Sequence, residues 1–281
     1  MPNSKKLITS ASLITLLSKF SPIQANLQQI LKSFTDKIGN SSPVEPRQLS
    51  AATIQNLNEY GCWCYFDQDH GRGKGHPVNE IDAICKTLHD GYECAMMDWE
   101  EERPHLVAQN KLCVPWEVRY NSATDLGGTS LVDACTQNNR KICSQRACMI
   151  EGQFVLSIYQ LVIDFYEPDA SAKHSNGFDP TKMCKTTNQI INNGPGGGGG
   201  SGGSGGSNNL DGDMDNGNGD GNGDGGNGGG SSKPTRMCCG DYPARFPYDT
   251  MKGTRKCCVD KTYFSKIMEC CDGNVQLYGS C

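Results

Sequence analysis

Sixteen cysteines constrain this chain of 281 residues more than any other feature of its sequence. Because cytosolic thiols are kept reduced, so many cysteines are typical of a secreted protein cross-linked by disulfides. Nine of them fall within residues 49–184 and seven within residues 237–281. Since both counts are odd, the economical pairing has one disulfide that joins the two groups. The alternatives are a free thiol in each group, or a bond to another chain.

The first 25 residues have the pattern of a cleaved signal peptide. Lys5 and Lys6 precede a short apolar stretch at residues 7–17, and the segment ends at Ala25. Such a stretch is too short for a bilayer, which takes about 20 residues to cross. An ordinary amphipathic helix is the alternative. We therefore expect a secreted, extracellular protein, and its net charge of −5 argues against nucleic acid as a partner.

Composition divides the rest of the chain into four parts. Residues 26–48 predict a short amphipathic helix and then a loop or pro-segment, and residues 49–184 form the disulfide-rich body. Residues 194–235 are almost entirely Gly, Ser, Asn and Asp, which predicts a flexible linker because so little apolar surface cannot drive folding. Residues 237–281 predict a small module in which disulfides replace a core. Binding of an extracellular partner is a candidate role for this module.

The segment from Tyr60 to Asp90 carries the candidate chemistry. Closely spaced cysteines precede a Gly-rich loop, and Pro77 leads from that loop into a helix that includes His89. Glycines allow several carbonyls to turn toward one point, and carbonyls together with a carboxylate are the ligands that Ca²⁺ prefers. Asp90 is the candidate carboxylate, and His89 is the candidate general base for a water molecule. Calcium would polarise a carbonyl, so the pattern points to metal-assisted ester hydrolysis.

This segment resembles secreted phospholipase A2. That family has a Tyr-Gly-Cys-x-Cys-Gly calcium loop, followed by a Pro, an Asp, paired cysteines and a His-Asp dyad. Tyr60–Cys64 matches the start of the loop, residues 73–77 match its end, and Cys85 with His89–Asp90 matches the catalytic helix. The resemblance implies a base at His89 and a calcium carboxylate at Asp90. It also implies backbone ligands to calcium, which would be Trp63, Gly71 and Gly73.

The fold that the resemblance implies is mainly α, with two long antiparallel helices bridged by disulfides beside the calcium loop. The second helix should carry a carboxylate that orients the histidine, and apolar periodicity places this helix at about residues 131–166. Glu151 lies on its apolar face and is the candidate, whereas a surface salt bridge is the alternative role for that residue. Asp133 and Asp164 are the other candidates. Tyr92, one turn beyond the histidine, is the candidate for an additional hydrogen bond in the site.

The chain departs from the family at several positions, among them Tyr65, where Gly is expected, and Tyr92 with Cys94, which replace the usual Cys-Tyr order after the dyad. The loop is lengthened by residues 65–70, so its ligands stay open, and Asp67 and Asp69 are further candidates. Cys85 alone replaces the paired cysteines that precede the dyad. Aromatic side chains favour the membrane interface, and four of them are expected to contact a bilayer: Trp63, Tyr65, Phe66 and Trp99.

The expected function is therefore that of a calcium-dependent phospholipase A2, a carboxylic ester hydrolase active in lipid degradation. It would cleave the sn-2 ester of glycerophospholipids at a membrane surface. Two alternatives stay open. One is a catalytically silent relative that binds lipid or a receptor, and the other is an extracellular matrix or adhesion protein that works through residues 237–281.

Overall fold

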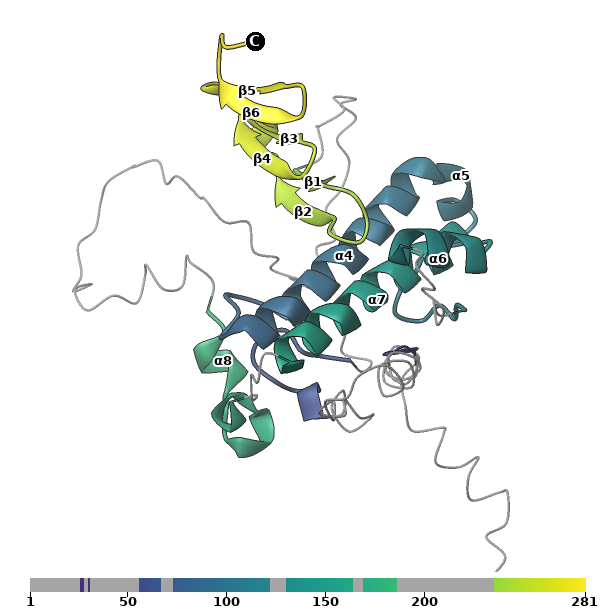
Figure 1. The fold of residues 1–281 in the computed structure, drawn as a ribbon, viewed down its shortest axis with the longest axis vertical. Coiled ribbons are helices and arrows are strands. Elements are labelled where there is room, and N and C mark those ends of the chain that lie inside the picture. Colours follow the sequence, from purple (N-terminus) through teal and green to yellow (C-terminus); the bar gives the residue numbers. More distant parts are fainter. Residues whose placement is uncertain are drawn as a thin grey trace, which may run out of the picture.

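The computed structural model describes residues 26–27, 30, 56–66, 73–121, 130–163, 169–185 and 235–281. The expected signal peptide, Gly71 and the expected linker lie outside these residues. Within them the protein is rich in disulfides, with helices first and small antiparallel strand pairs last (Figure 1). The helices are α4 Glu80–Glu102, α5 Pro104–Val107, α6 Leu131–Asn138, α7 Ile142–Ile163 and α8 Pro180–Met183, with short 3₁₀ turns at Ala170–Ala172, His174–Asn176 and Met251–Gly253.

Helix α4 has clear start and stop signals. The side chain of Asn79 caps its N-terminus by accepting a hydrogen bond from the Asp82 backbone N–H, which satisfies one of the unpaired donors of the first turn. Acidic Glu80 and Asp82 in that turn also suit the positive end of the helix dipole. The helix ends before Pro104, because proline disfavours helical backbone in the residue that precedes it.

Helices α4 and α7 pack against each other, and their contacts run in opposite order along the chain. Near the start of α4, Ile84 lines a pocket together with Ser157 of α7, whereas at its end Glu102 forms an ion pair with Arg146. The helices approach closely at Gly91, where a Cβ atom would lie 3.0 Å from an Ile150 methyl group. Apolar residues of both helices belong to one buried cluster, including Ile81, Leu88, Tyr92, Ala147, Phe154, Val155 and Ile158.

The prediction of one helix over residues 131–166 is wrong, because the chain forms α6 and α7 with a break between them. The side chain of Asn139 explains the break, since its amide donates to the carbonyl oxygens of Cys135 at 2.9 Å and Asn121 at 3.0 Å. These bonds replace intrahelical ones at the end of α6. The disulfide between Cys135 and Cys148 then holds α6 against α7.

Eight disulfides use all sixteen cysteines. Such extensive disulfide bonding is typical of extracellular proteins. The bond between Cys94 and Cys238 joins the body to the C-terminal module, as the odd cysteine counts predicted. Two others attach the loop before α4, Cys62 to Cys184 and Cys64 to Cys85. Among the described helices, none is both long and apolar enough to cross a membrane.

The C-terminal module consists of three antiparallel hairpins. They pair β1 Arg236–Cys239 with β2 Phe246–Asp249, β3 Arg255–Cys258 with β4 Lys261–Phe264, and β5 Met268–Cys271 with β6 Asn274–Leu277. Adjacent residues of a strand point to opposite faces, so each cysteine pair can make bonds in two directions. Cys238 bonds to α4 and its neighbour Cys239 bonds to the next hairpin at Cys257.

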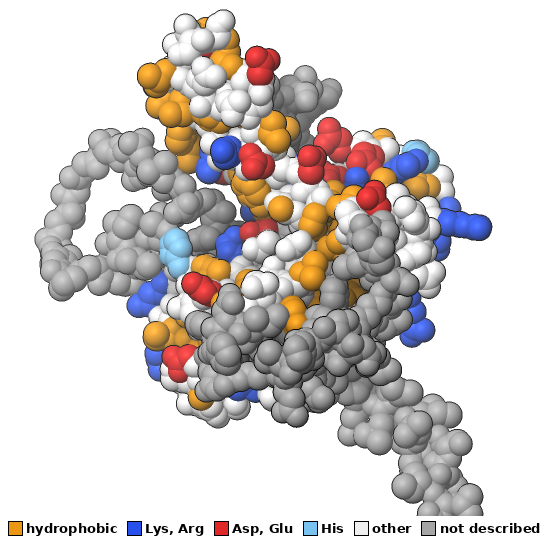
Figure 2. Space-filling model, in the orientation of Figure 1, with side chains coloured by type: hydrophobic (Ala, Val, Ile, Leu, Met, Phe, Trp, Pro, Cys, Tyr) orange, Lys and Arg blue, Asp and Glu red, His pale blue; other side chains and the backbone are white. Residues whose placement is uncertain are grey.

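Charged side chains complete the junction between the module and α4. The carboxylate of Asp98 accepts from the Tyr242 hydroxyl at 2.8 Å, and from Nε at 2.8 Å and Nη2 at 3.0 Å of Arg245. Arg236 of β1 forms an ion pair with Glu93 at 3.0 Å. Acidic and basic side chains meet where the module joins the helices (Figure 2). The first hairpin thus rests on α4, while β5 and β6 lie at the far end (Figure 1).

Candidate functional site

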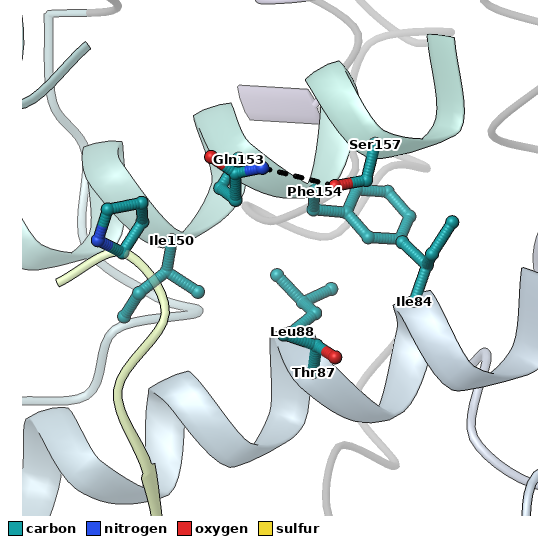
Figure 3. Close-up of a pocket in the computed structure, with 8 residues that line it drawn as sticks. Ile84, Thr87, Leu88, Ile150, Gln153, Phe154 and Ser157 are labelled. Carbon is teal, nitrogen blue, oxygen red and sulfur yellow. Dashed lines mark hydrogen bonds between the residues drawn. The ribbon is translucent and has the colours of Figure 1, made fainter. Parts of the chain in front are cut away.

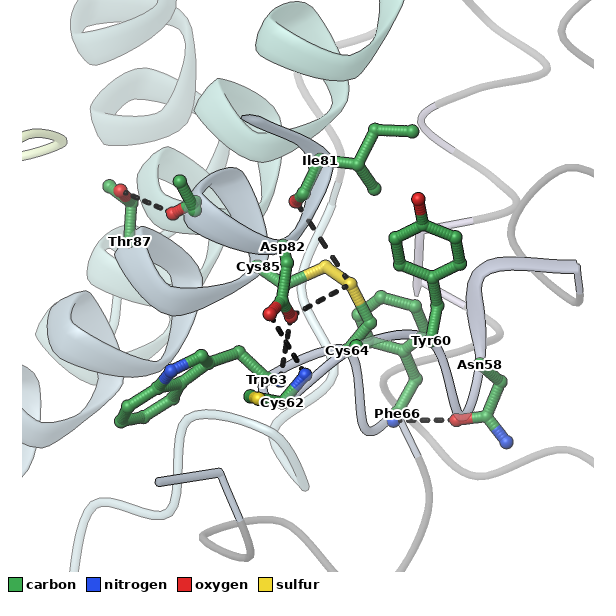
Figure 4. Close-up of a disulfide and its surroundings, with 12 residues drawn as sticks. Asn58, Tyr60, Cys62, Trp63, Cys64, Phe66, Ile81, Asp82, Cys85 and Thr87 are labelled. Atoms are coloured by element: carbon green, nitrogen blue, oxygen red, sulfur yellow. Dashed lines mark hydrogen bonds between the residues drawn. A yellow bond between two sulfur atoms is a disulfide. The ribbon is translucent and has the colours of Figure 1, made fainter. Parts of the chain in front are cut away.

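The fully buried carboxylate of Asp82 anchors the loop that precedes α4. One oxygen accepts from the backbone N–H groups of Cys62 at 2.8 Å and Val78 at 2.9 Å, and the other accepts from that of Trp63 at 2.7 Å (Figure 4). Burial raises the pKa of Asp82, and these backbone bonds oppose the rise. Gly61 makes the close approach possible, since a Cβ there would lie 2.4 Å from the Asp82 carboxyl carbon. One side chain of the first helical turn therefore holds both ends of the loop.

Trp63 closes the loop against its glycine-rich end. Its indole N–H donates to the Gly75 carbonyl at 3.0 Å, and its ring lies directly on Gly73. A Cβ at Gly73 would come within 2.4 Å of the indole ring, so only glycine fits there. The contact between Trp63 and Gly73 involves the indole ring, and the carbonyl of Trp63, which is the predicted ligand, accepts from the Tyr65 backbone N–H at 2.9 Å. Gly71, Asp67 and Asp69 lie outside the described residues.

His89 lies on α4 facing this loop. The disulfide between Cys64 and Cys85 fixes the loop one turn before the histidine, and the rings of Trp63 and His89 have their centres 6.0 Å apart. The His89 side chain is 6% exposed. Burial lowers the pKa of His89 to about 4. A hydrogen bond with the Trp63 backbone favours the charged form and partly opposes this shift. The imidazole is therefore neutral at pH 7, which is the state that a general base requires.

Asp90 lies beside His89 and is already paired with a cation. Its two carboxylate oxygens accept from Nζ of Lys86 at 2.8 and 3.0 Å. The same ammonium lies 5.0 Å from the centre of the Trp63 ring. Burial raises the pKa of Asp90, whereas Lys86, and Arg236 of the module, favour its charged form.

Glu151 is completely buried, so the alternative of a surface salt bridge is wrong. It accepts hydrogen bonds from two phenols, that of Tyr92 at 2.8 Å and that of Tyr120 at 2.6 Å. Burial raises its pKa to about 8, and the bonds from Tyr120, Tyr92 and Asn26 oppose that rise. Tyr92 therefore links α4 to Glu151 on α7. This contact fixes the register of the two helices in the turn beside His89.

The other predicted carboxylates and aromatic residues lie elsewhere. Asp133 is exposed in the first turn of α6 and accepts from the Ser130 hydroxyl, and Asp164 lies outside the described residues. The expectation that Tyr65 and Phe66 contact a bilayer is wrong, because they are 2% and 0% exposed. Trp63 and Trp99 are half-buried.

Three residues of the site carry no role in the sequence-based predictions: Asp82, Lys86 and Tyr120. Lys86 had a detectable signal, since its spacing of four from Asp90 places the two side chains on one helix face. The role of Tyr120, and the bonds of Asp82 to Cys62 and Trp63, depend on contacts between residues 19 or more positions apart. No pattern in the neighbouring sequence predicts such contacts.

The donor set near Asp90 suits calcium in kind. A carboxylate is a hard oxygen ligand, and the carboxylate of Asp90 already holds the Lys86 ammonium. The cluster of metal-ligating side chains that the described residues contain, Glu269, Cys271 and Cys281, does not suit a metal. Its cysteines are joined in a disulfide, and the Glu269 carboxylate accepts from two backbone N–H groups.

A pocket between α4 and α7 is apolar but small. Ile84, Leu88, Ile150 and Phe154 point into it from the two helices (Figure 3), and Pro243 of the module adds to its lining. Its volume of about 50 Å³ is enough for one or two water molecules and too small for a lipid chain. We regard this pocket as a packing gap at the helix junction.

Comparison of the chain with models of known protein families and with curated proteins gives no match in either case. Its chemistry is therefore inferred from the residues of the site itself.

Proposed function

We propose that the protein is a secreted, calcium-dependent phospholipase A2 that hydrolyses the sn-2 ester of glycerophospholipids at a membrane surface. The observation that carries this proposal is the burial of a neutral His89 next to a loop that Asp82 holds in place, with the Asp90 carboxylate following it in the helix. The proposed fold of the body is mainly α, with α4 and α7 as the two antiparallel helices of that family. Trp63, Gly73 and Asp90 are the proposed calcium ligands in the described residues.

In this proposal His89 acts as a base on water and not as a nucleophile. It removes a proton while the water oxygen bonds to the ester carbonyl carbon, and it then gives that proton to the leaving alkoxide. The products are a free fatty acid and a lysophospholipid. Calcium, when bound, would stabilise the charge that develops on the carbonyl oxygen. Tyr92 and Glu151 act as positioning residues, because they fix α4 against α7 beside the histidine.

A fatty-acid release assay on phosphatidylcholine vesicles, with calcium or with chelator, tests the proposal. The His89→Gln variant removes the base, and we expect the calcium-dependent rate to fall by at least about 100-fold. Calcium binding should be retained, because the substitution leaves Asp90 in place. His105→Gln is the matched control, since His105 is exposed on α5, and its rate should be unchanged. An unaltered rate in His89→Gln would rule out the mechanism.

The pairing of Lys86 with Asp90 favours a second candidate, a catalytically silent relative that binds lipid through the same fold. An ammonium on both carboxylate oxygens would keep calcium out if it never left. The assay separates the two candidates. Vesicle binding without fatty-acid release, even at saturating calcium, would select the silent protein. An extracellular partner for residues 237–281 stays a prediction.

A further inference from the structure

The side chain of Lys86 lies between two groups that both attract a cation. Its ammonium contacts Asp90 at 2.8 and 3.0 Å and lies 5.0 Å from the centre of the Trp63 ring. Lys86 also follows Cys85 directly, at the position where the paired cysteines of phospholipase A2 would place their second member.

A divalent ion and an ammonium cannot both hold the same carboxylate oxygens. A bound ion would repel the Lys86 ammonium and occupy the Asp90 oxygens that now accept from it, so the ammonium needs another site. The indole ring of Trp63 offers one, because the face of an aromatic ring attracts cations. The lysine has little distance to cover, since it already lies over that ring. Its side chain is 34% exposed, which leaves it free to change rotamer.

We propose that Lys86 is a built-in competitor for the divalent ion at Asp90, and that it shifts onto the Trp63 ring when the ion binds. This inference rests on the calcium role of Asp90 in the proposed function. It goes further by assigning to Lys86 the control of calcium affinity. Calcium must then displace the Lys86 ammonium from Asp90 before it binds, which lowers the calcium affinity of the site.

The other charges near Asp90 do not take over this role. Glu93 and Arg236 face the same region, and they neutralise each other in an ion pair at 3.0 Å. Among the described residues, Lys86 is the cation that pairs directly with Asp90, so its removal leaves that carboxylate without such a partner within this part of the chain. Partly exposed ion pairs are weak, so the competition should be moderate. We expect calcium affinity to rise by up to about fivefold when the ammonium is removed.

Calorimetric titration of the full-length protein with calcium tests the proposal. Lys86→Gln removes the charge with little effect on the helix, because glutamine is a good helix former, and Lys86→Met serves as a second variant. Lys182→Gln is the matched control. Lys182 also pairs with an aspartate, Asp179, but its side chain is 80% exposed on α8. We expect tighter calcium binding in both Lys86 variants and no change in the control.

Tryptophan fluorescence gives a readout that does not depend on catalysis. Calcium should change the emission of Trp63 in the wild type, because the ammonium moves toward the ring, and should change it less in Lys86→Gln. Trp63→Phe identifies the signal among the three tryptophans. Equal calcium affinity in the wild type and both Lys86 variants, with binding lost in Asp90→Asn, would overturn this inference alone. Absence of calcium binding in every variant would overturn it together with the proposed function.

Discussion

The helical body and the C-terminal module keep their shapes by different means. In the body, α4 and α7 bury a continuous set of aliphatic and aromatic side chains between them. In the module, the buried residues among those described are only Cys239, Gly240, Tyr248, Thr250 and Cys258. Several of its large apolar side chains face solvent instead, with Ile267 58%, Leu277 67% and Tyr278 71% exposed. The body is held by a core and the module by its cross-links.

This difference explains why the candidate chemistry lies in the body. A histidine whose pKa is lowered to about 4 and a glutamate whose pKa is raised to about 8 both require burial. Only packed helices exclude enough water to provide that environment. The module contributes cross-links and surface charges, such as Arg236 near Asp90. The module can therefore change the electrostatics of the site through its surface charges, but it has too few buried residues to form such a site itself.

The largest expected effect comes from cutting the covalent link between the two regions. Replacing Cys94 and Cys238 with serine removes a bond between residues 144 positions apart. Constraining so long a loop stabilises a protein by about 4 to 5 kcal/mol in the chain-entropy model. We expect a loss of that size in the free energy of unfolding, measured by guanidinium denaturation.

The control is the terminal bond between Cys271 and Cys281, which spans only 10 positions. Its removal should cost about 2 to 3 kcal/mol in the same model. A larger loss from the terminal bond than from the long one would contradict the view that cross-links hold the module in proportion to the chain they restrict.

The sequence predicted a disulfide between the regions but not its members. Odd counts of nine and seven cysteines made such a bond the economical pairing, with a free thiol in each group or a bond to another chain as the alternatives. Cys94 is the partner because its face of α4 packs against β1. That packing depends on two ion pairs, Asp98 with Arg245 and Glu93 with Arg236. Those contacts join residues more than 140 positions apart. No local pattern encodes them.

The same limit applies inside the body. The segment from Tyr60 to Asp90 could be located because glycines, cysteines and the His-Asp pair have a recognisable spacing. The end of α6 could not be located, because the apolar periodicity of the sequence continues past it. The helix ends where the Asn139 side chain donates to the Cys135 carbonyl. The environment of Glu151 was equally hidden. Its apolar face predicted burial, whereas the bond from Tyr120 comes from a loop with no periodicity.

A second prediction concerns the buried glutamate, which only the body could accommodate. Between its ordinary pKa of 4.5 and its folded pKa of about 8, Glu151 keeps its proton in the folded protein and loses it on unfolding. Stability should therefore fall as the pH rises through this range. The pKa of His89 is lowered from 6.5 to about 4, so its contribution makes the stability rise with pH between these two values. Measurements from pH 6.5 to pH 8 isolate the glutamate.

Glu151→Gln removes this ionisation while it keeps the shape of the side chain. We expect the wild type to lose about 2 kcal/mol of unfolding free energy between pH 6.5 and pH 8, and the variant to lose much less. Glu100→Gln, at an exposed position on α4, should keep the wild-type slope. Parallel slopes for the wild type and Glu151→Gln would mean that the pKa of this buried carboxyl is not raised.

The smallest expected effect tests whether charge, as well as a disulfide, fastens the module to α4. Asp98 is 10% exposed and receives three hydrogen bonds from Tyr242 and Arg245. Asp98→Asn should cost about 1 kcal/mol, because the amide keeps some of these bonds but loses its charge. The control Asp179→Asn removes a charge from an exposed pair with Lys182 and should cost less than about 0.5 kcal/mol.

Combining Asp98→Asn with the loss of Cys94 and Cys238 sharpens this test. With the disulfide present, the module stays at high local concentration beside α4, and the charge contact stabilises a placement that is already constrained. Without the disulfide, the contacts of Arg245 and Arg236 must hold the module by themselves. Asp98→Asn should then increase the rate at which protease cleaves residues 235–281 from the folded body by about fivefold. An equal rate with and without the Asp98 carboxylate would show that the disulfide alone joins the two regions.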